Sequence, residues 1–391
     1  MKKIHKITTA IFLPFVMLFS SCFDPIFYEI RKDVKPETAT VSGNIPQITR
    51  FTIGGEEYLF LSADKGLRYK RADNETHDSW KVAKLPFNLV NFNFDNTDMD
   101  GKQLIGVYAD SDYLYLHAAP YITTGSEGTS IPWDLELWAS KDPLNKDSWK
   151  KVTAEFPIGY YSSTGKYGSL FHLFQTNAPK KEHRQVYVYN DVKEKYYKLN
   201  GTTLSEVVIS ASDILDGGSV AYSAAYFDGG VKFFSSTAVI TDEKYGDKDD
   251  TTSEARNLYY AQGPDLYYYT SEGYKKACSA KTTISSLAVT KDSIIIGLGN
   301  IMSKSSDTGG ITRVKINENG IPESSTSGFS TNAEMQISSA YTVLALLNAT
   351  PENPELESAL YASITFSGLN GLPANIGLWS YYQGRGNWNR E

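Results

Sequence analysis

Three aspartates cluster before a glycine in one short segment of this 391-residue chain. Asp95, Asp98 and Asp100 supply the carboxylate oxygens that calcium prefers, and Gly101 would allow a sharp loop. Position 107, which would close an EF-hand loop with a carboxylate, is a valine, and Asp100-Gly101 is a good turn by itself. The segment is therefore interpreted as an acidic turn, with these aspartates as a weak calcium candidate and no other metal ligand assigned.

The sequence contains none of the common motifs for hydrolytic or phosphate-binding sites. There is no Gly-x-Ser-x-Gly elbow, no His-Glu-x-x-His and no phosphate-binding Gly-x-x-x-x-Gly-Lys loop. His117 and His172 lie in apolar runs, which favours packed or channel-facing histidines over general bases. The 45 acids are too many to indicate a glycosidase carboxylate pair. We expect no catalytic residue and no cofactor.

The first 21 residues are typical of a secretory signal. Lys2 and Lys3 precede an apolar run, residues 7–19, that is too short to span a bilayer. Cys22 follows directly, and the second cysteine, Cys278, is expected as a small buried residue of a strand. The predicted organisation is a signal peptide at 1–21, a tether at 22–37 and one domain at 38–391.

Composition limits the classes of protein that this chain can belong to. Lys and Arg number 38 against 45 Asp and Glu, so an acidic chain with formal charge −7 is a poor general ligand for nucleic acid. A hydrophobic content of 41% excludes disorder throughout. The 27 tyrosines suit half-buried strands that keep the phenol tip in water.

Strand-like runs joined by tight turns repeat along the chain. In the first unit, residues 48–53 turn at Gly54-Gly55 into residues 58–61, a strong hairpin pattern. The string Asp-Ser-Trp-Lys recurs at 78–81 and 147–150. Six such units, about 60 residues apart, predict an all-β chain that forms a β-propeller. Six blades of four antiparallel strands are expected, with seven blades or two packed β-sandwiches as alternatives.

The fourth unit of this series is longer than the others. It is predicted to group the hairpin at 222–234 with the tyrosine-rich strands near 258–260 and 266–269. The tyrosines of those strands offer either a surface that stacks on sugars or peptides or packing between blades, and packing is favoured. They are Tyr259, Tyr260, Tyr267, Tyr268 and Tyr269.

The string Leu18-Phe19-Ser20-Ser21-Cys22 resembles a bacterial lipobox, in the relaxed form familiar in spirochaetes and Bacteroidetes. In that family the cysteine becomes the first residue of the mature chain and carries diacylglycerol and a further acyl group. The resemblance implies lipidation at Cys22 and a membrane partner. It also implies export to the cell envelope, with the outer membrane favoured on either its periplasmic or its surface face.

Three units resemble the Asp-box, or BNR, type of propeller repeat. Gly66-Leu67, Asp73 and Trp80 follow its order, and similar strings end at Trp149 and Trp388. The resemblance implies that the box is a structural turn whose tryptophan packs between blades. The family includes sialidases, assembly factors and sorting receptors, so this fold alone does not give a function. The residues assigned to the structural repeat are Trp80, Trp138, Trp149, Trp379 and Trp388.

The function expected from these features is that of an exported lipoprotein whose propeller is a rigid binding platform for a protein or a glycan. A monomer without nucleic-acid partners is expected. Two alternatives stay open: a sialidase-like hydrolase that acts on glycans, and an accessory subunit of an envelope assembly complex.

Overall fold

A computed structural model describes about three fifths of the chain, and residues 39–391 form one compact unit. The predicted signal peptide, the tether and Cys22 lie outside the described residues. The described ranges are 41–63, 66–73, 80–89, 102–120, 132–133, 136–153, 159–160, 171–178, 180–191, 193–241, 257–270, 273–290, 292–299, 309–328, 341–349, 359–366, 376–382 and 387–391.

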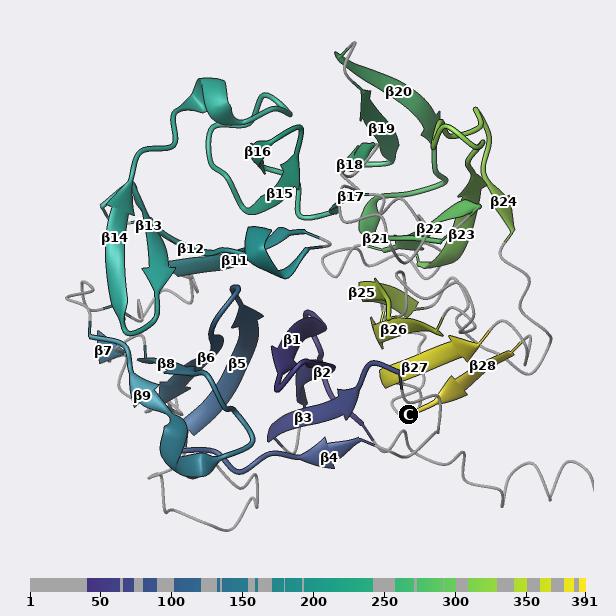
Figure 1. Ribbon diagram of the computed structural model, residues 1–391. Coiled ribbons are helices and arrows are strands. Elements are labelled where there is room, and N and C mark those ends of the chain that lie inside the picture. Colours follow the sequence, from purple (N-terminus) through teal and green to yellow (C-terminus); the bar gives the residue numbers. More distant parts are fainter. Residues whose placement is uncertain are drawn as a thin grey trace, which may run out of the picture. The chain divides into compact units, whose positions relative to one another are not determined.

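Six sheets rich in antiparallel pairs follow one another around a ring, which makes the unit the six-bladed β-propeller that the repeats predicted (Figure 1). Each blade begins with its innermost strand. The first three blades contain β1 (Thr49–Ile53), β2 (Glu56–Ala63), β3 (Gly66–Arg71) and β4 (Lys81–Val82); β5 (Lys102–Ala109), β6 (Leu114–Pro120), β8 (Glu136–Ser140) and β9 (Lys150–Lys151); and β11 (Phe171–Asn177), β12 (Val186–Asn190), β13 (Lys195–Asn200) and β14 (Thr203–Val207).

The last three blades each contain four antiparallel strands. They are β17 (Val239–Thr241), β18 (Leu258–Gln262), β19 (Asp265–Thr270) and β20 (Gly273–Ser279); β21 (Ile284–Val289), β22 (Ser293–Leu298), β23 (Gly310–Lys315) and β24 (Ser327–Gly328); and β25 (Tyr341–Asn348), β26 (Ala359–Phe366), β27 (Gly377–Tyr382) and β28 (Asn387–Arg390).

Smaller elements lie outside this pattern. β7 (Pro132–Trp133) and β10 (Gly159–Tyr160) pair with each other, and three 3-10 helices are present: η1 (Lys146–Ser148), η2 (Lys181–His183) and η3 (Ala211–Asp213). Within the described ranges, no helix has the length and apolar character needed to cross a membrane.

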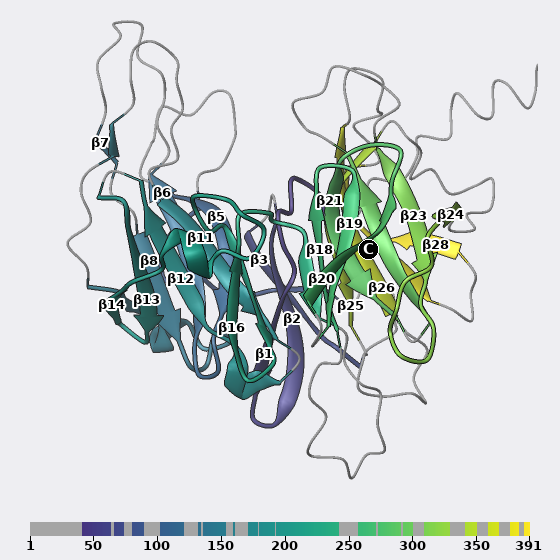
Figure 2. The same ribbon diagram turned by 90° about the horizontal axis from the view of Figure 1, so that it is seen from above.

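The expectation of four antiparallel strands in every blade is wrong for the third sheet, which has six. The hairpin β15 (Ser223–Phe227) and β16 (Gly230–Phe234) joins β11 by a parallel pairing of Thr176 with Ala224. Figures 1 and 2 place this hairpin beside β11. The repeat pattern of the sequence predicted it instead in the fourth blade, whose innermost strand is the three-residue β17.

Local sequence explains the first hairpin. β1 and β2 are joined by Gly54 and Gly55, which both have positive φ, at 59° and 88°. Two left-handed residues in a two-residue turn match the twist of the flanking strands, and glycine adopts this conformation without steric cost.

The apolar core is divided among the junctions between neighbouring sheets. One cluster joins Phe60 and Leu67 of the first blade to Val107 and Leu116 of the second. Further clusters fill the other junctions of the ring. The β15–β16 hairpin is buried on both sides, because Ala224 packs toward the third blade and Phe234 toward the fourth. No blade buries both of its faces alone, which is the physical reason for the ring.

The first and sixth blades are joined by backbone bonds and a buried ion pair. Val41 N donates to Glu391 O at 2.8 Å, and Leu378 N donates to Val41 O at 3.0 Å. The Lys70 ammonium lies 3.2 Å from Glu391 Oε2, and Trp80 Nε1 donates to the same oxygen at 2.7 Å. Because neither charged side chain of this pair is exposed, the pair is part of the core that closes the ring.

Candidate binding pocket at the propeller axis

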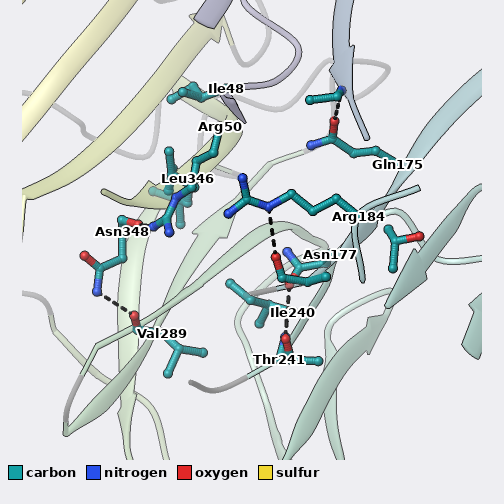
Figure 3. Close-up of a pocket in the computed structure, with 14 residues that line it drawn as sticks. Ile48, Arg50, Gln175, Asn177, Arg184, Ile240, Thr241, Val289, Leu346 and Asn348 are labelled. Carbon is teal, nitrogen blue, oxygen red and sulfur yellow. Dashed lines mark hydrogen bonds between the residues drawn. The ribbon is translucent and has the colours of Figure 1, made fainter. Parts of the chain in front are cut away.

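One pocket of about 140 Å³ is lined by the innermost strands of all six blades (Figure 3). We call it the axial pocket. Ile48, Ala178 and Arg184 complete its wall from the adjoining segments. Each innermost strand contributes at least one residue, and these are Arg50 of β1, Ala109 of β5, Thr176 of β11, Thr241 of β17, Val289 of β21 and Asn348 of β25.

Amide side chains satisfy backbone groups along the inner edges of the blades. Gln175 Oε1 accepts a bond from Ala109 N at 3.0 Å, joining the third blade to the second. Asn348 Nδ2 donates to Val289 O at 2.9 Å, joining the sixth to the fifth (Figure 3). Apart from β11, which also pairs with β15, each innermost strand ends its sheet, so these bonds supply partners that the sheet itself does not. The wall of the axial pocket is therefore fixed in place.

Asn177 makes a similar link between the third and fourth blades. Its Oδ1 accepts bonds from the backbone N and the Oγ1 of Thr241, each at 3.3 Å (Figure 3). The short strand β17 is thus held against β11 by a side chain.

Two arginines bring positive charge to the axial pocket. Arg50 reaches across the junction of the first and sixth blades and donates from Nη2 to Asn348 O. Arg184 follows the 3-10 helix η2, and its Nε donates to Ala178 O at 3.4 Å. In Figure 3 the guanidinium group of Arg50 lies beside Leu346 and Asn348, and the Arg184 side chain extends toward it. Arginine stays charged at any physiological pH and presents several N–H donors in one plane.

Glu57 of β2 is shared by the two arginines. Its Oε1 lies 2.9 Å from Arg184 Nη2, and its Oε2 lies 3.7 Å from Arg50 Nη1. The arginine side chains are only 8% and 11% exposed, whereas the Glu57 side chain is 29% exposed. We call these three residues the arginine–glutamate cluster. Its carboxylate is the member with the most access to water.

The rest of the pocket wall combines aliphatic and neutral polar groups. Ile48, Ile240 and Leu346 supply branched aliphatic surface, and no aromatic ring lines the pocket within the described part of the chain. The Thr176 hydroxyl is buried and has no hydrogen-bond partner among the described residues, and the residue is 3% exposed. A wall of this kind favours a ligand with a small aliphatic part and an anionic group.

The predicted calcium candidate and the lipidation site are not among the described residues. Asp95, Asp98 and Asp100 fall in the gap between 89 and 102, and Cys22 precedes residue 41. Among the described residues, no group of three or more His, Cys, Asp or Glu side chains is placed to hold a metal ion. Cys278 is a free cysteine buried in β20, as expected, and burial raises the pKa of its thiol.

The repeat tryptophans lie away from the axial pocket. Trp80 packs edge-on against Tyr361 of the sixth blade, with ring centroids 5.8 Å apart, and Trp149 is buried between the first and second blades. Trp379 and Trp388 are buried between the fifth and sixth blades. Trp138 is half-buried and contacts Phe87 at a centroid distance of 6.0 Å.

The tyrosine-rich strands of the fourth blade pack against their neighbours on both faces. Tyr259 and Tyr268 lie in the cluster shared with the fifth blade. Tyr260, Tyr267 and Tyr269 lie in the cluster shared with the β15–β16 hairpin. Tyr259 and Tyr260 are buried.

The two histidines considered for catalysis lie in different blades. His117 of β6 pairs with Gly106 and Leu137, and burial lowers its pKa to about 4. His172 of β11 has Nε2 2.9 Å from Asp191 Oδ2 and contacts the ring of Tyr222. Neither histidine lines the axial pocket.

Sequence reasoning did not find the arginine–glutamate cluster. Arg50, Glu57 and Arg184 share no motif, and Arg184 is 127 residues from Glu57. The amides that end the inner strands, Asn177 and Asn348, were a usable signal. A strand that begins apolar and ends in an amide suits an edge whose last backbone groups need a side-chain partner.

Comparisons with known proteins give a weak likeness to several solved structures. No family model and no curated protein sequence matches the chain. The GH43 BlXynB protein from Bacillus licheniformis is 11% identical with a TM-score of 0.35, over 90% of this chain and 56% of that chain. A fucose-specific lectin from Aleuria aurantia is 10% identical with a TM-score of 0.35, over 91% and 96%. BBS1N, solved in complex with ARL6DN, is 13% identical with a TM-score of 0.39, over 86% and 95%.

Proposed function

We propose that this protein is an exported, lipid-anchored binding protein whose propeller receives an anionic group of its protein or glycan partner in the axial pocket. One observation carries the proposal: a pocket lined by all six blades holds two arginines that converge on one carboxylate. Fixed inner strands supply a preorganised wall, which lowers the entropic cost of binding.

The pocket chemistry supports binding more than hydrolysis of a glycan. Glycoside hydrolysis ordinarily needs two carboxyl groups, one on each side of the scissile bond. No Asp or Glu is among the described residues that line the axial pocket, and Glu57 is bound by both arginines. The hydrolase alternative has its own test, because turnover of any member of a broad panel of chromogenic glycosides would establish it.

A lipid anchor at Cys22 is the second part of the proposal. The basic start, the short apolar run and the cysteine that follows it support this modification. Several acyl chains would hold the propeller stably at a membrane, whereas a single chain binds only marginally. Mass spectrometry of the first peptide of the mature protein tests it. We expect fatty acid on Cys22, and an unmodified Cys22 or a chain cleaved elsewhere would contradict the anchor.

Glycan and peptide arrays probed with the full-length protein test the binding role. We expect a defined set of anionic ligands to be bound by the wild type and lost in Arg184→Gln. The same set bound by both proteins would show that the axial pocket is not the site. An Arg71→Gln variant is the matched control, because Arg71 forms exposed ion pairs with Glu56 and Asp73 in the first blade and does not line the axial pocket.

A further inference from the structure

The arginine–glutamate cluster already holds a carboxylate between two guanidinium groups, and this carboxylate belongs to the protein. Arg184 Nη2 contacts Glu57 Oε1 at 2.9 Å, and Arg50 Nη1 lies 3.7 Å from Oε2. Charged hydrogen bonds of this kind are stronger and more directional than neutral ones. Glu57 therefore shows which chemical group fits between the two arginines.

Glu57 is the member of the cluster best able to leave. Its side chain is 29% exposed, against 8% for Arg184 and 11% for Arg50. Its backbone stays in place when the side chain moves, because Ala72 N donates to Glu57 O at 2.9 Å and β2 pairs with β1 and β3. In the exchange another carboxylate takes the place of that of Glu57, so the two nearly buried arginines keep an anionic partner.

The walls beside the arginines indicate what the rest of the ligand is. Ile48, Ile240 and Leu346 offer branched aliphatic surface. A pyranose ring presents a flat face that packs well on an aromatic ring, and the described lining contains none. The cavity of about 140 Å³ is smaller than the usual pocket for a drug-sized ligand. A compact aliphatic body matches this wall better than a sugar does.

We propose that the axial pocket binds a compact aliphatic carboxylate, and that the ligand's carboxylate replaces that of Glu57 between Arg50 and Arg184. This inference rests on the proposed function and names its ligand class. The carboxylate can come from a free branched-chain acid or from the chain end of a peptide whose last residue is aliphatic. Glu57 acts as a built-in competitor that occupies the arginines until the ligand arrives.

Competition has a consequence that a merely structural role of Glu57 does not share. When a site is open for only about a tenth of the time, the apparent affinity is about tenfold lower than the intrinsic affinity. Removing the competing carboxylate should therefore tighten ligand binding, even though the same substitution removes an ion pair from the fold.

Calorimetric titration of the purified full-length chain tests the inference. The probes are 3-methylbutanoate, the dipeptide acid N-acetyl-Gly-Leu, the C-terminal amide of that dipeptide, and glucuronate. We expect both aliphatic acids to bind and the amide not to bind. The tighter of the two acids identifies the source of the carboxylate. Tighter binding of glucuronate than of either acid, or equal binding of the amide, would overturn the inference without use of any variant.

The variant Glu57→Gln then tests the exchange. We expect it to bind 3-methylbutanoate about tenfold more tightly than the wild type does. Glu56→Gln is the matched control, because it removes the same charge from the adjacent residue, whose partner is Arg71 at 2.8 Å. Unchanged or weaker binding in Glu57→Gln overturns the exchange. If no acid binds but array ligands still depend on Arg184, the inference fails while the proposed function stands.

Discussion

Two ion-paired clusters that include residues of the first blade differ in their exposure to water. Lys70 and Glu391 form an ion pair whose side chains are both 0% exposed, between the first and sixth blades. Glu57 meets Arg50 and Arg184 at the axial pocket, where its carboxylate keeps contact with solvent. Both clusters join residues more than a hundred positions apart, but only one of them leaves a charged group accessible.

The difference separates a structural pair from a site that can exchange partners. A buried charge that loses its partner leaves the other charge uncompensated in a medium that solvates it poorly. A carboxylate with access to water can be rehydrated when it leaves the arginines, so replacing it is inexpensive. Burial, more than distance, therefore distinguishes the pair that closes the ring from the cluster that can bind a ligand.

The largest effect is expected at the buried pair. Lys70→Met should lower the free energy of unfolding by about 3–5 kcal/mol, because Glu391 keeps its charge in the core without the ammonium. Denaturant unfolding followed by tryptophan fluorescence measures this. Lys195→Ala is the control, since Lys195 and Glu206 form an exposed pair whose loss should change stability far less. Equal losses in the two variants would contradict the comparison.

The next effect concerns the pocket itself. Arg184→Gln should weaken binding of 3-methylbutanoate at least tenfold, which corresponds to about 1.4 kcal/mol, because one of the two charged donors is removed. Calorimetric titration of Arg184→Gln with 3-methylbutanoate measures this change in affinity, and Arg71→Gln is the control. If Arg184→Gln loses as much stability as Lys70→Met but binds 3-methylbutanoate as well as the wild type does, Arg184 has a structural role and not a binding role.

Lowering the pH should destabilise the junction between the second and third blades. Burial lowers the pKa of His117 from 6.5 to about 4, so the folded protein binds a proton there less readily than the unfolded chain. The contribution of neutral His117 to the free energy of unfolding is therefore fully present above pH 6.5, and it is lost as the pH falls toward 4. Because His117 is partly exposed, we expect His117→Gln to remove about 1–2 kcal/mol of that loss.

Unfolding in denaturant at pH 7 and pH 4.5, compared between His117→Gln and the wild type, measures this difference. An identical loss of stability in the two proteins would show that other groups cause the acid sensitivity.

The smallest effect is expected at Thr176. Its hydroxyl is buried in the pocket wall and finds no hydrogen-bond partner in the described part of the chain, so Thr176→Val should raise the free energy of unfolding by about 1 kcal/mol. Thermal and denaturant unfolding measure the gain. A loss of stability would instead mean that the hydroxyl is hydrogen-bonded in solution.

The fold was predictable because its determinants are local. Gly54-Gly55 predicted the turn between β1 and β2, and alternating apolar runs predicted most of the strands that follow. The hairpin β15–β16 was placed in the wrong blade, because its pairing with β11 is parallel and joins residues about fifty positions apart. β17 was missed since three residues carry no usable period.

The candidate site was not predictable in the same way. Arg50 and Arg184 were among nine arginines with no motif to distinguish them, and only the ring brings both to Glu57. A repeat pattern in the sequence determines how the blades are built. It does not determine which side chains meet at the axis, because those contacts join different blades.

A crystal structure of the full-length protein soaked with 3-methylbutanoate tests the central claim most directly. The account predicts the ligand's carboxylate between the guanidinium groups of Arg50 and Arg184, with the Glu57 side chain turned toward solvent. A ligand bound elsewhere, with the contact between Glu57 and Arg184 kept at its present 2.9 Å, would contradict it.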